Sequence, residues 1–257
     1  MTSTHHRSPP SPAVQAELGA LGSFGGSLEA DLSSSASIDA LVKEVSSQQL
    51  RLDALVINSG VHCQDGFSKE GVEETVNINT LGVARLTREL LPLLAHNATV
   101  LISSSASSRG WMGTDEDLLN LKSSLVDAFP SEFIRCQMLY GRSKALINAF
   151  VMRMAKEHPN IRFLSAFPNP THTDMLVSGI GKATEILRYP PFFRAGTQAF
   201  DSFLLFWVRA LTRPVEKVAR QYVYGLTSNL PSGSFFFKET PYRPMPYEEA
   251  AAFKITF

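Results

Sequence analysis

The sequence predicts an α/β fold built on a doubly wound parallel sheet. Short apolar runs of strand length alternate along the chain with longer segments whose apolar residues recur at helical spacing. This alternation is typical of parallel βαβ units, in which helices cover both faces of one sheet. A chain of 257 residues, 44% of them hydrophobic, suffices for one large core. We expect a single domain over residues 13–257, preceded by a disordered segment over residues 1–12.

The expected helices and strands follow from apolar periodicity and from the turn residues between them. The expected strands are Leu28–Leu32, Leu55–Ile57, Thr99–Ile102, Ile161–Phe167 and Ser234–Phe237. The expected helices are Ala13–Leu21, Ser37–Val45, Glu73–Ala95, Asp115–Asp127, Tyr140–Glu157 and Pro214–Leu226. A glycine-rich turn is expected over Gly22–Ser27, and Thr114 is the expected N-cap of the helix that begins at Asp115.

Charge balance and hydropathy exclude two classes of partner. Lys plus Arg and Asp plus Glu both number 24, so no net field favours nucleic acid or an anionic membrane surface. No segment reaches the roughly 18–20 apolar residues of a membrane span. The most apolar candidate is Phe200–Leu211, where Asp201 and Arg209 favour a buried or subunit-facing helix, with membrane contact as the alternative. We expect no nucleic-acid partner and no transmembrane span.

The cysteines and the N-terminus favour a cytoplasmic protein. Cys63 and Cys136 have neither CxxC nor metal-ligand spacing, and a secreted scaffold of this size usually has more cysteines. Residues 1–12 are polar and proline-rich and lack the apolar stretch of a secretory signal. We therefore expect a reducing, cytoplasmic environment and no metal site.

Tyr140 and Lys144 form the pattern that is most informative about chemistry. They stand four residues apart, so they share one face of a helix at about 6 Å along its axis. A nearby ammonium favours the phenolate of a tyrosine, whose pKa is ordinarily about 10, and promotes proton exchange at neutral pH. Alone, this spacing is more often a half-buried tyrosine beside a solvated lysine. The serine cluster Ser103 to Ser105 ends the preceding strand, where a hydroxyl can reach a carbonyl bound beside Tyr140.

These residues resemble, in type and order, the short-chain dehydrogenase/reductase family, whose members have a Rossmann-like fold. The strand-end serine of the family resembles Ser104, and its YxxxK helix resembles Tyr140 to Lys144. The helical asparagine of its NxxG pattern, which holds a relay water, resembles Asn79. The resemblance covers about residues 31–237 and implies Ser104, Tyr140, Lys144 and Asn79 as the catalytic group.

The same resemblance implies a cofactor site at the carboxyl ends of the strands. The NAG turn of the family resembles Asn58-Ser59-Gly60, and its adenine-contacting acid resembles Asp31, although Asp-Leu-Ser is equally typical of a helix-capping turn. Its nicotinamide-contacting segment resembles Pro168-Asn169 and Thr173. The implied cofactor-binding residues are Asp31, Asn58, Gly60, Tyr140, Lys144, Pro168 and Thr173.

The opening segment of the family has no counterpart in this sequence. A strand followed by TGxxxGxG normally begins the fold and holds the pyrophosphate at a helix N-terminus. The glycines of Gly22–Ser27 lack a preceding apolar strand. We therefore expect an N-terminally truncated sheet, with the first βαβ unit largely missing. The strand Leu55–Ile57 then becomes an exposed apolar edge.

The leading hypothesis for function is an NAD(P)(H)-dependent oxidoreductase that interconverts an alcohol and a carbonyl. Arg7 favours NADP, with NAD open, and the apolar stretch Phe192–Leu211 favours a hydrophobic small-molecule substrate. The helices Glu73–Ala95 and Tyr140–Glu157 resemble the family's four-helix interface, which implies a homodimer. The alternative, motivated by the missing phosphate loop, is a catalytically inactive remnant or interaction scaffold that does not bind dinucleotide.

Overall fold

The computed structural model describes residues 20, 27–62, 66–111, 114–121, 132–168, 171, 212–243 and 245–254. Three expected features lie wholly or almost wholly outside these residues: the helix Ala13–Leu21, the turn Gly22–Ser27 and the apolar stretch Phe192–Leu211. The expected disordered segment over residues 1–12 also lies outside them.

A five-stranded sheet in the order β1-β2-β3-β4-β5 forms the centre of the molecule. Its strands are β1 (Leu52–Ile57), β2 (Leu94–Ser103), β3 (Arg162–Phe167), β4 (Ser234–Phe237) and β5 (Thr240–Tyr242). The first four are parallel, and β5 pairs antiparallel with β4. Ser103 pairs with Ala166 near the ends of β2 and β3, so the carboxyl ends of the parallel strands meet at one edge.

Helices connect these strands in the order expected of a doubly wound sheet. The α-helices are α2 (Ser35–Ser47), α3 (Glu74–Val76), α4 (Val83–Leu90), α5 (Asp115–Leu119), α6 (Glu132–Glu157), α9 (Val215–Thr227) and α10 (Pro246–Lys254). A π-helix, η1 (Asn77–Gly82), joins α3 to α4, and two 3₁₀-helices are η2 (Leu91–Leu93) and η3 (Ala106–Gly110).

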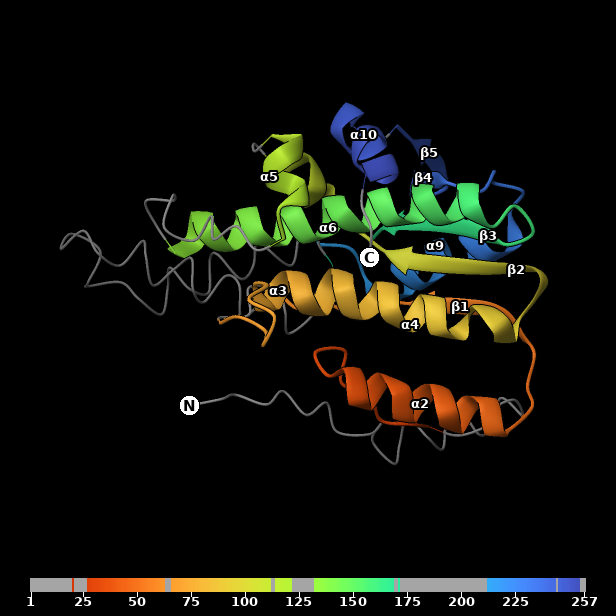
Figure 1. Ribbon diagram of the computed structural model, residues 1–257. Helices are drawn as coiled ribbons and strands as arrows, with labels where there is room; N and C mark the ends of the chain where they lie inside the picture. Colours follow the sequence, from red (N-terminus) through yellow and green to blue (C-terminus); the bar gives the residue numbers. More distant parts are fainter. Residues whose placement is uncertain are drawn as a thin grey trace, which may run out of the picture.

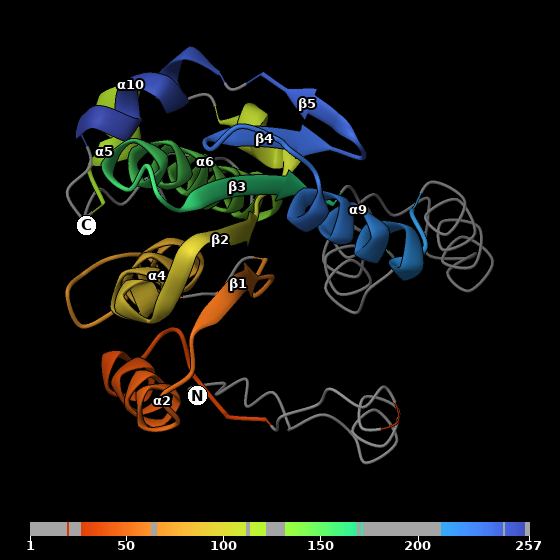
Figure 2. The same cartoon turned by 90° about the vertical axis from the view of Figure 1, so that its right-hand side faces the viewer.

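The helices cover both faces of the sheet. Figure 1 shows α2, α4 and α6 following one another across one face, and Figure 2 shows α9 on the opposite face. The contacts agree, because α9 lies against β2 and β3 while α6 lies against β3 from the other side. α10 extends the α6 layer and contacts both α6 and α5. This is a Rossmann-like α/β architecture.

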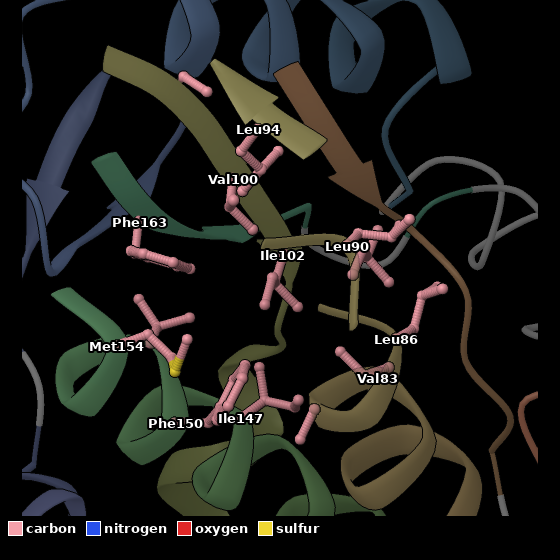
Figure 3. Close-up of a cluster of buried hydrophobic side chains, with 14 of the residues drawn as sticks. Val83, Leu86, Leu90, Leu94, Val100, Ile102, Ile147, Phe150, Met154 and Phe163 are labelled. Carbon is pink, nitrogen blue, oxygen red and sulfur yellow. The ribbon is translucent and has the colours of Figure 1, made fainter. Parts of the chain in front are cut away.

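Of three apolar clusters in the described residues, two pack against the sheet, one on each face. Figure 3 shows the larger cluster, in which strand residues meet side chains of α4 and α6. On α6, Ile147, Phe150 and Met154 recur at helical spacing and are fully buried. Along β2, Val100 and Ile102 belong to this cluster, whereas Leu101 points to the other face and joins the α9 cluster. Sheet and helix periodicities therefore agree with the apolar pattern of the sequence.

Strand β1 is an edge of the described sheet. It pairs with β2, and the side chain of Val56 is 42% exposed. The expectation of a partly exposed apolar edge over Leu55–Ile57 agrees with this burial pattern. Edge strands present unpaired backbone groups, which makes them a site of association in water.

The expected strand Leu28–Leu32 is wrong. Residues 27–34 form no helix or strand, and the described sheet has no strand beside them. A strand needs a neighbour for its N–H and C=O groups. Instead, the Asp31 carboxylate accepts hydrogen bonds from the main-chain N–H and the hydroxyl of Ser33 at 2.8 and 2.7 Å. Ser34 then caps α2, so Asp31 lies in the helix-capping turn that was the alternative interpretation.

The helix expected over Glu73–Ala95 is interrupted and ends earlier. It begins as α3, widens into the π-helix η1, continues as α4 and closes as η2. Pro92 lacks the N–H that a longer helix needs, so the chain leaves the helix there. Strand β2 consequently begins at Leu94, before the expected Thr99.

Two further helix boundaries and two further elements differ from expectation. The helix at Asp115 is opened by Thr114, whose capping box with Asp117 is present, but it ends at Leu119 and not at Asp127. Helix α6 begins at Glu132, which places Tyr140 in mid-helix and not at the start. β5 was not expected, because the hairpin is short and contains Pro241. The helix α10 was not expected either.

Within the described ranges, no helix combines the length and apolar character needed to cross a bilayer.

Gly82 lies where η1 approaches the segment before α2. A Cβ at this position would lie 2.1 Å from the main-chain oxygen of Leu32. Alanine ordinarily favours a helix over glycine by about 1 kcal/mol. Here we expect the opposite: Gly82→Ala lowers the free energy of unfolding by about 1–3 kcal/mol, because backbone must move. Urea unfolding measures the difference.

Gly110→Ala is the matched control, since a Cβ at Gly110 has no heavy atom within 4 Å. We expect its unfolding free energy to stay close to that of the wild type. A Gly82→Ala variant as stable as the wild type would contradict the close approach.

Candidate active site

Tyr140 and Lys144 lie one turn apart on α6, as their spacing predicts. The Lys144 Nζ atom is 5.7 Å from the centroid of the Tyr140 ring. Lys144 is 3% exposed, and Tyr140 is half-buried with its ring 4.9 Å from the His62 ring. The pair therefore faces the edge of the sheet where the parallel strands end.

The buried ammonium of Lys144 is held by the end of β2. Its Nζ atom donates a hydrogen bond to the main-chain oxygen of Ser103 at 3.1 Å. Burial lowers the pKa of Lys144 from 10.5 to about 8, because the charged form loses hydration. The interpretation of Lys144 as a solvated surface lysine is therefore excluded.

The pKa of Tyr140 shifts in the direction opposite to the one expected from the sequence. Burial raises the pKa of Tyr140, and a hydrogen bond with Ser105 lowers it by less. The Lys144 ammonium donates to the Ser103 carbonyl. Tyr140 is thus a neutral phenol at neutral pH in this arrangement.

The three serines at the end of β2 have different partners. Ser104, 2% exposed, donates from Oγ to the main-chain oxygen of Lys144 at 3.2 Å. Ser105 is the residue that hydrogen-bonds Tyr140, and it also caps η3 by accepting from the N–H of Ser107. The structure therefore brings Ser104 to the backbone of α6 and Ser105 to the phenol. The sequence alone did not separate these two hydroxyls.

Asn79 holds the loop that follows β1. Its Oδ1 accepts from the Val61 N–H at 2.8 Å, and its Nδ2 donates to the Val61 oxygen at 2.8 Å and to Ser143 Oγ at 3.0 Å. A Cβ at Gly60 would lie 3.2 Å from both Asn79 Oδ1 and Lys144 Nζ. The absence of a side chain at Gly60 therefore lets the loop lie directly against both residues.

Asn58 lies at the carboxyl end of β1 in a polar cluster with Ser103 and Tyr222. Asn58 Oδ1 is 2.9 Å from Ser103 Oγ and 2.7 Å from the Tyr222 hydroxyl. Tyr222 comes from α9 and was not expected at the site. No sequence signal distinguished it, because an isolated tyrosine on an amphipathic helix is usually part of the core.

A second buried polar network lies one turn beyond Lys144. Asn148 Nδ2 donates to Ser108 Oγ at 3.2 Å and to Glu248 Oε1 at 2.8 Å, while its Oδ1 accepts from Ser165 Oγ at 3.0 Å. Burial raises the pKa of Glu248. The network joins α6, η3, β3 and α10 behind the candidate site, and neither Asn148 nor Glu248 had an expected role.

The remaining expected cofactor residues are less closely grouped. Asp31 lies in the capping turn of α2, near Glu74, whose pKa it helps to raise. The Pro168 oxygen, just after β3, accepts from Arg213 at 3.4 Å. Thr173 and Asn169 lie outside the described residues.

Cys136 on α6 is disulfide-bonded. Cys63 lies outside the described residues. Because disulfides are typical of oxidising compartments, cysteine usage no longer supports the expected reducing environment.

The fold and the grouped Tyr140 and Lys144 define a Rossmann-like protein with a candidate catalytic site at its sheet edge. A family model described as short chain dehydrogenase matches residues 4–115, which include Asn58, Asn79 and Ser104. Over these residues, the chain is similar to the short-chain dehydrogenase/reductase family.

Similar proteins agree with this finding. Retinol dehydrogenase 14 of Mus musculus is 29% identical over 177 residues, 67% of this chain and 49% of that protein. The (+)-neomenthol dehydrogenase of Arabidopsis thaliana is 26% identical over 189 residues, 56% of this chain and 64% of that protein. This chain thus spans about half to two thirds of the length of these curated relatives.

Solved structures support the fold. A putative short chain dehydrogenase from Escherichia coli CFT073, complexed with NADPH, superposes with a TM-score of 0.59 at 16% identity. The similarity covers 89% of this chain and 81% of that chain.

Lys144→Met tests the cost of the buried ammonium. Between about pH 8 and 10.5, the unfolded chain binds a proton that Lys144 has released in the folded chain. The free energy of unfolding of the wild type therefore rises with pH through this window, by on the order of 3 kcal/mol. Lys144→Met lacks this rise. We therefore expect its free energy of unfolding to exceed that of the wild type at neutral pH, and this difference to disappear by pH 10.5.

Denaturant unfolding at neutral pH and between about pH 8 and 10.5 measures the difference in unfolding free energy between Lys144→Met and the wild type. If this difference stayed constant from neutral pH to pH 10.5, Lys144 would be hydrated in the folded chain.

Proposed function

We propose that this chain is an NAD(P)(H)-dependent oxidoreductase that interconverts an alcohol and a carbonyl. The observation that carries the proposal is the pairing of a neutral phenol, Tyr140, with a fully buried ammonium, Lys144, at the carboxyl ends of β1 and β2. Buried ionisable groups with perturbed pKa values are frequent at functional sites. Similarity of residues 4–115 to a family model described as short chain dehydrogenase supports this class of reaction.

Four residues have assigned roles in the proposal. In the reduction direction, Tyr140 gives a proton to the carbonyl oxygen, and its raised pKa means that the phenol is protonated at neutral pH. Ser104 donates a hydrogen bond to the same oxygen after rotation of its hydroxyl. Lys144 stabilises the phenolate left behind, and Asn79 supports the proton relay.

The described residues fit a nicotinamide dinucleotide at the reactive end of the site. The lack of a side chain at Gly60 lets the loop after β1 lie against Lys144 Nζ, at the carboxyl end of β1. The ammonium has three N–H donors, and one goes to Ser103, so donors remain for ligand hydroxyls. Further proposed cofactor residues are Asp31, Asn58, Pro168 and Thr173. The bound dinucleotide would supply or accept the hydride. NADP is the proposed form, with NAD as the alternative.

We propose a hydrophobic small molecule as the substrate. The names of the relatives, a retinol dehydrogenase and a neomenthol dehydrogenase, refer to apolar alcohols, and this supports the proposal. A homodimer through the helices α4 and α6 and a cytoplasmic location also stay predictions.

Tyr140→Phe removes the proposed proton donor while keeping the ring. With NADPH or NADH and a panel of aldehydes and ketones, we expect kcat to fall by at least about 100-fold, because general acid catalysis contributes factors of this size. Cofactor oxidation followed by absorbance measures the rate. Equal rates in both proteins would reject Tyr140 as the donor.

Calorimetric titration of NADPH and NADH provides the control. If the wild type and Tyr140→Phe bind the nucleotide equally well, the lower rate of the variant reflects the chemical step and not cofactor binding. If neither nucleotide binds and no carbonyl is reduced, the oxidoreductase proposal fails in favour of an interaction scaffold.

Ser104→Ala and Ser105→Ala separate the two candidate hydroxyls. The family pattern assigns Ser104, so we expect Ser104→Ala to lower kcat/KM by at least about tenfold and Ser105→Ala to lower it less. The two variants remove the same group from adjacent positions, which makes each the control of the other. The reverse order would transfer the role to Ser105, the partner of Tyr140 in the structure.

A further inference from the structure

The hydroxyl of Tyr222 joins the far face of the sheet to the candidate active site. It lies 2.7 Å from Asn58 Oδ1 and in short contact with Ser103 Oγ, and Ser103 Oγ is 2.9 Å from Asn58 Oδ1. Tyr222 belongs to α9, which covers the face opposite to α6 (Figure 2). Three elements therefore meet in one polar cluster at the carboxyl ends of β1 and β2.

The hydrogen bonds of this cluster depend on the Tyr222 hydroxyl. Asn58 Oδ1 only accepts, so the three oxygen atoms share two hydroxyl protons, those of Ser103 and Tyr222. In one arrangement, Tyr222 donates to Ser103, which donates to Asn58; in the other, the order of the hydroxyls is reversed. Both need a protonated phenol, and burial raises the pKa of Tyr222 to about 12. Loss of this hydroxyl removes one of the two donors.

Ser103 connects the cluster to Lys144. Its side chain contacts Tyr222, while its main-chain oxygen accepts the hydrogen bond of Lys144 Nζ at 3.1 Å. Ser103 is the last residue of β2 and is 6% exposed. The next residue, Ser104, donates to the main-chain oxygen of Lys144 at 3.2 Å. The orientation of this strand end therefore sets the position of the ammonium.

We propose that Tyr222 is a positioning residue, which fixes the Ser103 carbonyl and through it holds Lys144 beside Tyr140. The consequence for catalysis rests on the proposed function, in which Lys144 stabilises the Tyr140 phenolate. Tyr222 is neutral and acts by geometry: the Ser104 N–H, on the same peptide as the Ser103 carbonyl, donates to the Ala166 oxygen at 2.8 Å, and Tyr222 adds a second constraint through the Ser103 side chain.

The groups around Lys144 favour a geometric effect over a charge effect. Desolvation by burial is the cause of the lowered pKa of Lys144. The ionisable groups that face this part of the site are Tyr140 on α6, Tyr222 on α9 and His62 in the loop after β1, whose ring lies against Tyr140. Phenylalanine at position 222 keeps burial and changes no charge at neutral pH. A change in the pKa of Lys144 in Tyr222→Phe then reports a change in the position of its acceptor, the Ser103 main-chain oxygen.

Tyr222→Phe in the full chain tests the proposal through the pKa of Lys144. Reductive methylation as a function of pH, followed by mass spectrometry of the Lys144 peptide, measures this pKa. We expect the pKa to fall by about half a unit or more, because a fixed acceptor stabilises the ammonium and its loss does not. Where turnover is detected, we expect kcat to fall about tenfold with KM nearly unchanged, as misplacement of a supporting group predicts.

Two further variants make the result specific. Tyr224→Phe removes the same hydroxyl from the same helix, at a ring that packs against Phe236, and should leave the pKa of Lys144 unchanged. Ser103→Ala breaks the link at its other end and should reproduce the fall. The double variant Tyr222→Phe/Ser103→Ala should fall no further than either single variant.

The outcomes separate the two proposals. A pKa of Lys144 in Tyr222→Phe that equals that of Tyr224→Phe, or rises, overturns the positioning role even if carbonyls are reduced. A fall shared by Tyr222→Phe and Ser103→Ala supports the positioning role even if no carbonyl is reduced, in which case the proposed function alone fails. Thermal unfolding of all variants identifies any that do not fold, and Ser103→Ala then carries the test.

Discussion

The reciprocal contact between Lys144 and the end of β2 is the constraint on which the site depends. Lys144 Nζ donates to the Ser103 oxygen, and Ser104 Oγ donates to the Lys144 oxygen. Each element thus supplies a side chain to the backbone of the other. A buried ammonium without an acceptor is strongly unfavourable, so this contact requires α6 and β2 to meet in one register. The position of Tyr140, one turn away, follows from that register.

Around this contact, polar groups are satisfied mainly by main chain and by neighbouring amides. The Asn79 side chain forms hydrogen bonds with both the N–H and the main-chain oxygen of Val61. These bonds hold the loop at Gly60 against Lys144. The π-helix that contains Asn79 departs from regular helix at the point where this side chain turns inward. Asn148 performs a similar task behind the site, with Glu248 as its partner. Fully paired polar networks of this kind rigidify a site, since every alternative arrangement leaves a buried group unpaired.

The open edge at β1 and the cluster at Tyr222 are two aspects of the same geometry. β1 has a neighbour on one side only within the described sheet, and Val56 is exposed there. On the α9 face, Tyr222 reaches the end of this edge strand and contacts Asn58. A helix that packs mainly on β2 and β3 therefore also contributes to the order of the strand next to the open edge.

Local periodicity determined the parallel sheet, most helices and the pairing of Tyr140 with Lys144. Alternation of strand-length and helix-length apolar runs is a local property, and a spacing of four residues places two side chains on one helical face in any context. Tertiary structure alone decided the rest. Leu28–Leu32 has strand character but no partner, so Asp31 became a helix cap. Three features depend on residues that are distant in the chain: the different partners of Ser104 and Ser105, the raised pKa of Tyr140, and the contact of Tyr222 with Asn58. Folding decides them, because desolvation and hydrogen-bond partners are set by neighbours in space.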